Sequence, residues 1–152
     1  IWSRLVGSEM CIRDRALAQA SAALEYVTNY VQEREQFGKP LVDFQAVQIK
    51  LADMLMKVEA ARLLIHKAAF NAQNGLPDIL ESSTAKCFSN EMSREVTTTA
   101  MQLMGGYGYN KEYGMERRVR DAFGWGIAGG TIDIQKINIA SAMIGRRFNQ
   151  RN

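Results

Sequence analysis

Cysteine and histidine are nearly missing from this chain. Its 152 residues include two cysteines and one histidine. Cys11 and Cys87 show neither metal-ligand nor redox spacing, and two cysteines do not make a disulfide framework in a chain of this length. His66 stands in a helical pattern without a carboxylate or cysteine at ligand spacing, which is typical of a solvated side chain. We therefore expect a cytoplasmic protein with no metal site and no disulfide scaffold.

Proline, long apolar runs and charge of one sign are also scarce. Only two prolines occur, and no apolar run approaches the roughly 18 residues of a membrane span. The formal charge is +3, but acids and bases are interspersed, and no basic block is interleaved with aromatics as in a nucleic-acid groove. These absences argue against a membrane span and against nucleic acid as a partner. Ala, Met, Gln, Glu and Arg are plentiful instead, which favours an all-α protein.

The first 15 residues differ from the rest of the chain, because they show no helical period and no cap. They resemble translated sequencing-adapter read-through of the kind found at the ends of metagenomic open reading frames. The alternative is an irregular native N-terminus, and no apolar region of the length that a signal peptide needs is present. We expect residues 1–15 to be non-native or irregular, and residues 16–152 to form one domain.

The remaining chain shows helical stripes separated by helix stops. Apolar residues recur at spacings of three and four over residues 16–34, 44–72 and 85–103. Asp43 is expected to cap the second of these helices. Asn74-Gly75 is expected to end it.

Glycines and a threonine mark the later helix boundaries. Gly105 is expected to end the third helix, and a short charged helix follows around residues 111–121. Thr131 is expected to cap the last helix, with Asp133 in its first turn against the helix dipole. Four long helices with short connections predict an antiparallel up-and-down four-helix bundle.

Three segments carry a resemblance to a known family. They are EREQFGKPLVDFQAVQIKLADM, QLMGGYGYNKEYGMERRVRDA and GTIDIQ. In this order and at this spacing they resemble the C-terminal helical domain of acyl-CoA dehydrogenases, over about residues 16–149. The resemblance implies FAD as cofactor, an acyl-CoA substrate oxidised to an enoyl-CoA in fatty acid or amino acid catabolism, and a homodimer or homotetramer. It also implies electron-transfer flavoprotein as the electron acceptor, and an N-terminal helical domain and a middle β domain that are absent from residues 16–152.

The resemblance also implies which residues contact the flavin. Arg34 and Gln36 fall on the loop that reaches the FAD of the neighbouring subunit, where a guanidinium can donate bidentate hydrogen bonds to phosphate. An arginine that only balances a helix C-terminus is the alternative for Arg34, and an exposed polar position is the alternative for Gln102. The other implied contacts are Gln45 toward the same flavin, Gln102, Leu103, Met104, Gly105 and Gly106 along the adenine end, Thr131 and Asp133 beside the FAD of the same subunit, and Gly130 toward the substrate.

Gly129 is where the sequence departs from the family pattern. Many members carry a glutamate there as the base that removes the proton alpha to the thioester carbonyl. The match here is Gly129-Gly130-Thr131, so no catalytic residue is assigned. Branches with a small residue at this position place the glutamate on the preceding helix, and counting back along that pattern reaches Ser8. Glu9 is one residue away, and one helical residue rotates a side chain by roughly 100°.

Alternatives remain open at this point. Flavin monooxygenases of the same fold also lack that carboxylate, and a helical scaffold without chemistry is the alternative from a different class. Arg120 and Asp121 form either part of a surface ion-pair run or, as the resemblance implies, a structural clamp near the active site.

Overall fold

The computed structural model describes residues 2–72 and 77–148, with side chains from residue 11 onward. Most of this part is helical, which confirms the all-α class. The elements in chain order are α1 (Trp2–Glu33), β1 (Glu35–Gln36), β2 (Lys39–Pro40), η1 (Leu41–Asp43), α2 (Gln45–Phe70), α3 (Ile79–Met104), α4 (Gly106–Tyr109), η2 (Lys111–Tyr113), α5 (Met115–Trp125) and α6 (Ile132–Ile144).

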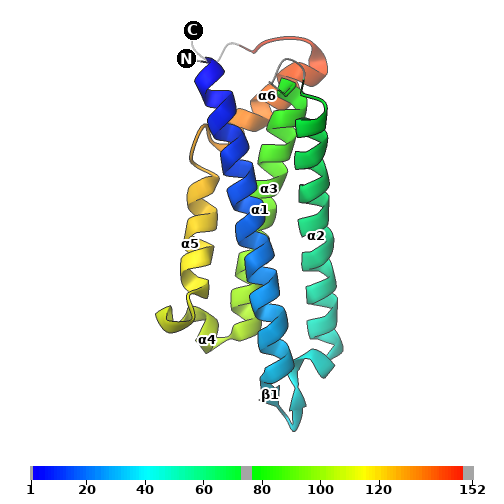
Figure 1. Cartoon of the computed structure of the whole chain (residues 1–152), viewed down its shortest axis with the longest axis vertical. Helices are drawn as coiled ribbons and strands as arrows, with labels where there is room; N and C mark the ends of the chain where they lie inside the picture. Colours follow the sequence, from blue (N-terminus) through cyan, green and yellow to red (C-terminus); the bar gives the residue numbers. More distant parts are fainter. Residues whose placement is uncertain (1, 73–76, 149–152) are drawn as a thin grey trace.

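Helices α1, α2, α3 and α5 lie side by side, and successive helices along the chain run in opposite directions (Figure 1). The central helix is α3, which contacts α1, α2, α5 and α6. The antiparallel four-helix bundle is therefore confirmed, with one correction. We expected the last helix to be the fourth member, but α5 takes that place beside α1 and α3. Helix α6 has 13 residues, roughly 20 Å of helix, and packs on α3 near one end of the bundle.

The core is built from the stripes seen in the sequence. Val27 and Val31 of α1 and Val58 of α2 are almost completely buried, and burying such a side chain stabilises the fold by about 1.5–3 kcal/mol. Alanines at 20, 61 and 85 are also buried and let the helices approach closely. The stripe residues found in the core are Leu17, Ala20, Val27, Val31, Met54, Val58, Ala61, Ile65, Ala68, Ala85, Met92 and Val96.

The N-terminal stretch is helical, so the irregular structure that we expected for residues 1–15 is wrong for the described part. Helix α1 begins at Trp2 and continues without a break past residue 15. Ile12 and Arg13 are buried, with 7% and 0% of their surface exposed. Ile12 extends the stripe by one turn from Ala16, and the charged residues between them hid this pattern. The non-native origin of the stretch stays a prediction.

The helix boundaries confirm two predictions and correct one. The Thr131 hydroxyl accepts a hydrogen bond from the Ile134 amide at 3.4 Å and caps α6. Gly105 ends α3 with φ 60°. The predicted cap Asp43 is wrong, because it lies in the 3-10 turn η1, while Phe44 precedes α2 without a side-chain cap. The predicted stop at Asn74-Gly75 lies outside the described residues.

A short hairpin makes the connection between α1 and α2. Strands β1 and β2 pair antiparallel, and the turn residues Phe37 and Gly38 have φ of 55° and 78°. Two-residue hairpin turns favour positive φ at both positions, which glycine adopts freely and phenylalanine adopts at a cost. The Phe37 side chain is 93% exposed. The turn therefore holds an aromatic ring in a strained, exposed position at the tip of the molecule.

Candidate functional site

The predicted flavin contacts from two distant segments meet at the hairpin end of the bundle. A cavity of about 560 Å³ opens there between the end of α1, β1, the end of α3 and α4. Seven of its lining residues belong to the set implied by the resemblance. We call this space the hairpin-end cavity, and its lining is Tyr30, Arg34, Gln36, Leu41, Gln102, Leu103, Met104, Gly105, Gly106, Tyr107 and Asn110.

Arg34 brings positive charge to the hairpin-end cavity. Its guanidinium lies 5.2 Å from the centre of the Tyr107 ring, an attractive cation–π arrangement. It makes no ion pair with any carboxylate in the described part of the chain. The backbone amide of Arg34 donates to the Tyr30 carbonyl at 2.8 Å, so the residue is anchored by its main chain. The side chain can therefore bind an anion without breaking an ion pair.

Two tyrosines were missed by the sequence reasoning. The Tyr30 hydroxyl donates to the Met104 carbonyl at 3.4 Å and links α1 to the end of α3. Burial raises the pKa of Tyr30, which keeps the phenol protonated as a donor. The Tyr107 ring packs between Tyr30 and Tyr113, with ring centres 6.3 and 5.1 Å away. Tyr107 lies within the GGYGYN run of the sequence, which was the available signal for it.

The glycine pair at the end of α3 lines the cavity without side chains. Gly105 has a positive φ, and a Cβ built on Gly105 or Gly106 would meet nothing within 4 Å. The chain turns there from α3 directly into α4. The turn therefore exposes main chain to the cavity with no side chain covering it, an arrangement that suits close approach of a ligand.

Gln45 is not among the residues that line the cavity. It is the first residue of α2 and is exposed at the same end of the bundle.

Thr131 and Asp133 lie near the opposite end of the bundle, at the start of α6 (Figure 1). Lys86 of α3 marks their level, because its ammonium donates to the carbonyls of Gly129 and Gly130. The 19 positions from Lys86 to Gly105 correspond to roughly 28 Å along a helix. The structure therefore gathers the implied contacts into two separate groups.

The turn before α6 offers no carboxylate at the position of the usual base. Gly129 has φ 63°, a left-handed conformation that favours glycine. Glu91, on the neighbouring turn of α3, is paired with Lys136 at 2.5 Å. Ser8 and Glu9 lie in the helical backbone of α1.

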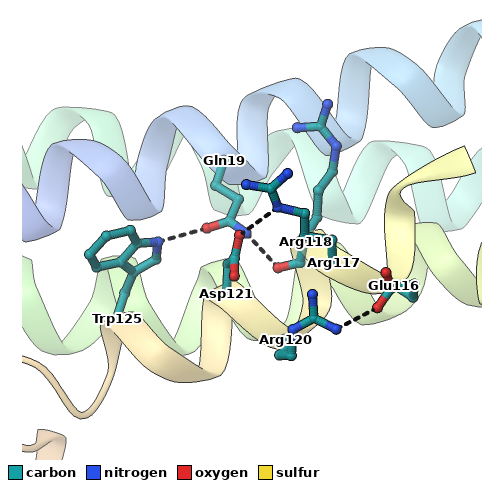
Figure 2. A network of polar contacts seen from close by, with 7 residues as sticks. All are labelled: Gln19, Glu116, Arg117, Arg118, Arg120, Asp121 and Trp125. Carbon is teal, nitrogen blue, oxygen red and sulfur yellow. Dashed lines mark hydrogen bonds and ion pairs between the residues drawn. The ribbon is translucent and has the colours of Figure 1, made fainter. Parts of the chain in front are cut away.

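The charged run on α5 forms surface ion pairs, seen in Figure 2. Arg120 pairs with Glu116 at 2.9 Å, and Asp121 pairs with Arg117 at 3.7 Å. Arg120 and Asp121 each pair within this run and not with each other, and a clamp near the active site stays a prediction of the resemblance. Pairs of this kind contribute about 0.3–0.5 kcal/mol each.

Gln19 links α1 to α5 by side-chain hydrogen bonds that the sequence did not predict. Its side chain accepts from the Trp125 indole at 2.9 Å and donates to the Arg118 carbonyl at 2.5 Å (Figure 2). The Arg15 guanidinium lies 5.1 Å from the Trp125 ring centre. These contacts hold α5 and therefore the start of the loop that leads to α6.

The described residues contain neither a candidate metal site nor a membrane-spanning helix. His66 is exposed, as expected. Within residues 2–72 and 77–148, no group of three or more His, Cys, Asp or Glu could hold a metal ion. None of the described helices is both long and apolar enough to cross a bilayer.

Comparison with known proteins gives a consistent picture. Residues 3–144 match the model of the family described as "Acyl-CoA dehydrogenase, C-terminal domain". A probable acyl-CoA dehydrogenase, FadE25 of Mycobacterium tuberculosis, is 44% identical over 131 residues, covering 86% of this chain and 34% of that protein. A 3-sulfinopropanoyl-CoA desulfinase of Cupriavidus necator is 40% identical over 135 residues, covering 89% and 34%. The chain thus spans about a third of the length of these relatives.

Solved structures agree with the sequence relatives. Butyryl-CoA dehydrogenase from Megasphaera elsdenii superposes with a TM-score of 0.88 at 41% identity, covering 92% of this chain and 37% of that one. A glutaryl-CoA dehydrogenase from Mycobacterium smegmatis in complex with FADH2 has a TM-score of 0.88 at 27% identity, covering 96% and 38%. The described fold is therefore the fold of a C-terminal segment in both enzymes.

Proposed function

We propose that this chain, which belongs to the acyl-CoA dehydrogenase family, completes the flavin site of an FAD-dependent acyl-CoA dehydrogenase. The part of the family that it matches is the C-terminal domain. The observation that supports this best is the hairpin-end cavity. Two segments that lie about 70 positions apart in the sequence supply seven of the residues that the family resemblance implies, and they share one space. An arginine without an acidic partner among the described residues, an aromatic ring and an open glycine turn are not expected together at one end of a generic helix bundle.

The residues of the hairpin-end cavity fit a dinucleotide such as FAD. Arg34 would donate to the pyrophosphate of a flavin held mainly by a second subunit, with Gln36 and Gln45 close by on the same end. Gln102, Leu103, Met104, Gly105 and Gly106 would lie along the adenine half, where the exposed main chain of the turn permits close contact. When bound, FAD supplies the acceptor for the hydride that leaves the acyl chain.

The start of α6 would serve the flavin and substrate of the same subunit. Thr131 and Asp133 would lie beside that FAD, and Gly130 would line the path of the acyl-CoA thioester. The two groups of contacts lie at different levels of the bundle, and a site shared between two subunits accounts for this separation.

The outer face of α2 supports assembly into a homodimer or homotetramer. Ile49, Met56, Leu63 and Phe70 follow one another every seven residues, and all four are exposed, Phe70 to 91%. An apolar stripe of this length on a helix that already buries its opposite face is typical of an interface. Electron-transfer flavoprotein is the acceptor that the resemblance implies for the assembled enzyme.

Gly129 favours a second candidate within the same family. A reaction on an acyl-CoA that does not begin with removal of the alpha proton would not need the loop glutamate. The relative from Cupriavidus necator is named for removal of a sulfinate group from 3-sulfinopropanoyl-CoA. The family match favours a dehydrogenase over the monooxygenase and scaffold alternatives, and the desulfinase is the alternative that shares the family.

A chimera tests both candidates. Residues 16–152 would replace the matching C-terminal segment of the Megasphaera elsdenii butyryl-CoA dehydrogenase. We expect a yellow protein that retains FAD, whereas Arg34→Lys should weaken FAD binding by about tenfold, because lysine lacks the bidentate fork. Arg62→Lys, at a partly exposed arginine paired with Glu59, is the matched control.

Stopped-flow bleaching of the chimera with butyryl-CoA under anaerobic conditions measures the chemistry. Without a loop carboxylate we expect bleaching at least about 10²-fold slower than in the parent enzyme, and Gly129→Glu should restore part of the rate. Release of sulfite from 3-sulfinopropanoyl-CoA without Gly129→Glu would favour the desulfinase. A colourless chimera that folds and assembles would contradict the proposed flavin role.

A further inference from the structure

Helix α3 carries a fully buried cation that none of the implied contacts includes. The Lys86 side chain is 1% exposed. Its ammonium donates to the Gly129 carbonyl at 2.5 Å and to the Gly130 carbonyl at 2.9 Å. Burying an ammonium is unfavourable unless it is hydrogen-bonded, and lysine is among the residues least often fully buried. The hydrogen bonds to these two carbonyls therefore help to make the burial of the ammonium possible.

Both acceptor residues lie in the turn that precedes α6. Gly129 and Gly130 have φ of 63° and 92°, so the turn uses two consecutive left-handed residues. A Cβ on Gly130 would lie 3.1 Å from the side-chain nitrogen of the buried Gln135 and 4.0 Å from the Lys86 ammonium. The turn is thus enclosed on its protein side by Lys86 and Gln135. Thr131, the cap of α6, follows immediately.

Two other side chains of α3 donate longer hydrogen bonds to main-chain carbonyls on either side of the loop. Arg94 donates to the Phe123 carbonyl at 3.3 Å, before the loop, and the Cys87 thiol donates to the Ile132 carbonyl at 3.6 Å, after it. Lys86 differs from both because its charged donor binds two successive carbonyls, at 2.5 and 2.9 Å. An ammonium has three donors and no acceptor, so both carbonyls must face α3.

We propose that Lys86 is a positioning residue, which fixes the Gly129–Thr131 turn and thereby the flavin-side and substrate-side contacts at the start of α6. The identity of the ligand in this proposal rests on the proposed function. The stabilisation of the turn by Lys86 does not depend on that function. A neutral side chain at this position would leave two carbonyls without their charged donor. The turn would then sample other arrangements while the bundle below it stays intact.

Amide hydrogen exchange on the 152-residue chain tests the hold on the turn. Lys86→Met keeps the length of the side chain and removes every donor. We expect exchange at residues 126–132 to rise by about tenfold or more, while the core amides of α1 and α2 keep their rates. Lys86→Arg, which keeps a cationic donor, should retain most of the protection. Lys57→Met, at a partly exposed lysine paired with Glu95, is the control and should leave the loop unchanged.

The same variants in the chimera test the consequence for the ligand. Lys86→Met should weaken FAD retention by about tenfold relative to Lys57→Met. Unchanged loop exchange, a uniform rise over the whole bundle, or a faster loop with unaltered FAD retention would each overturn the proposal. Should Lys86→Met prevent folding, Lys86→Gln takes its place under the same criteria. If the unmutated chimera holds no flavin, the proposed function fails, and the exchange experiment still decides the role of Lys86.

Discussion

At the scale of single residues, the two cysteines differ in expected reactivity because only one of them is buried. Cys11 is exposed and Cys87 is buried, and the Cys87 thiol donates to the Ile132 carbonyl. Burial, with a contribution from nearby Glu91, raises the pKa of Cys87 to about 11. The thiolate is the reactive form, so at pH 8 only about one Cys87 in 10³ is ionised. We expect a disulfide-exchange reagent at pH 8 to titrate one thiol in the folded chain and two after unfolding.

The Cys11→Ser chain is the control for this thiol titration and should show no fast reaction. Equal rates for both thiols in the folded chain would contradict the burial of Cys87.

The structure places Arg34, Gln36 and the Gln102–Gly106 segment around one cavity, and their contact with a flavin stays a prediction. Resemblance could select these residues because they belong to short motifs that can be matched one by one. It could not locate Gln19, whose partner Arg118 lies 99 positions away. Such a contact exists only because the bundle places α1 beside α5. A residue of this kind looks like any polar position on a helix until the packing is known.

At the scale of elements, the glycine at the end of α3 decides how the chain enters α4. Gly105→Ala should destabilise the fold by about 1–2 kcal/mol, because alanine resists a positive φ. Gly124→Ala is a matched control: Gly124 lies inside α5, and a Cβ there would also meet nothing within 4 Å. That change should be neutral or stabilise by up to about 1 kcal/mol.

Urea unfolding followed by circular dichroism measures both glycine variants. Equal effects of the two substitutions would show that the positive φ at Gly105 carries no cost. The comparison needs no ligand, so it is independent of the proposed function.

The helical stripes were predictable wherever one face of a helix meets the core. They give an incomplete account of α3, which contacts five other helices and buries polar residues as well as its apolar stripe. Ser89, Asn90 and Thr97 are fully buried there, and all three side chains donate to main-chain carbonyls one turn back. Periodicity of apolar residues cannot reveal buried polar positions of this kind. Ile12 was missed for a related reason, since a buried arginine follows it.

At the scale of the whole molecule, the two groups of implied flavin contacts lie at different levels of one helix bundle. Arg34 and Gly105 line the hairpin-end cavity, whereas Thr131 caps α6 near the other end. Their separation along α3 is fixed by helix geometry, so no small motion of a loop could bring them together. Under the proposed function, this separation requires that each flavin collects its contacts from more than one chain or domain.

The last prediction follows from this arrangement: the isolated chain should bind FAD weakly. It can offer one flavin only one group of contacts, and these must offset the cost of ordering the cofactor. We expect a dissociation constant weaker than about 1 μM at 25 °C, that is, less than about 8 kcal/mol of binding free energy. Titration of the chain with FAD, followed by flavin fluorescence, measures it, and the chimera that retains FAD is the control. A sub-micromolar constant for the isolated chain would show that a single bundle holds a complete flavin site, against the two-group arrangement argued here.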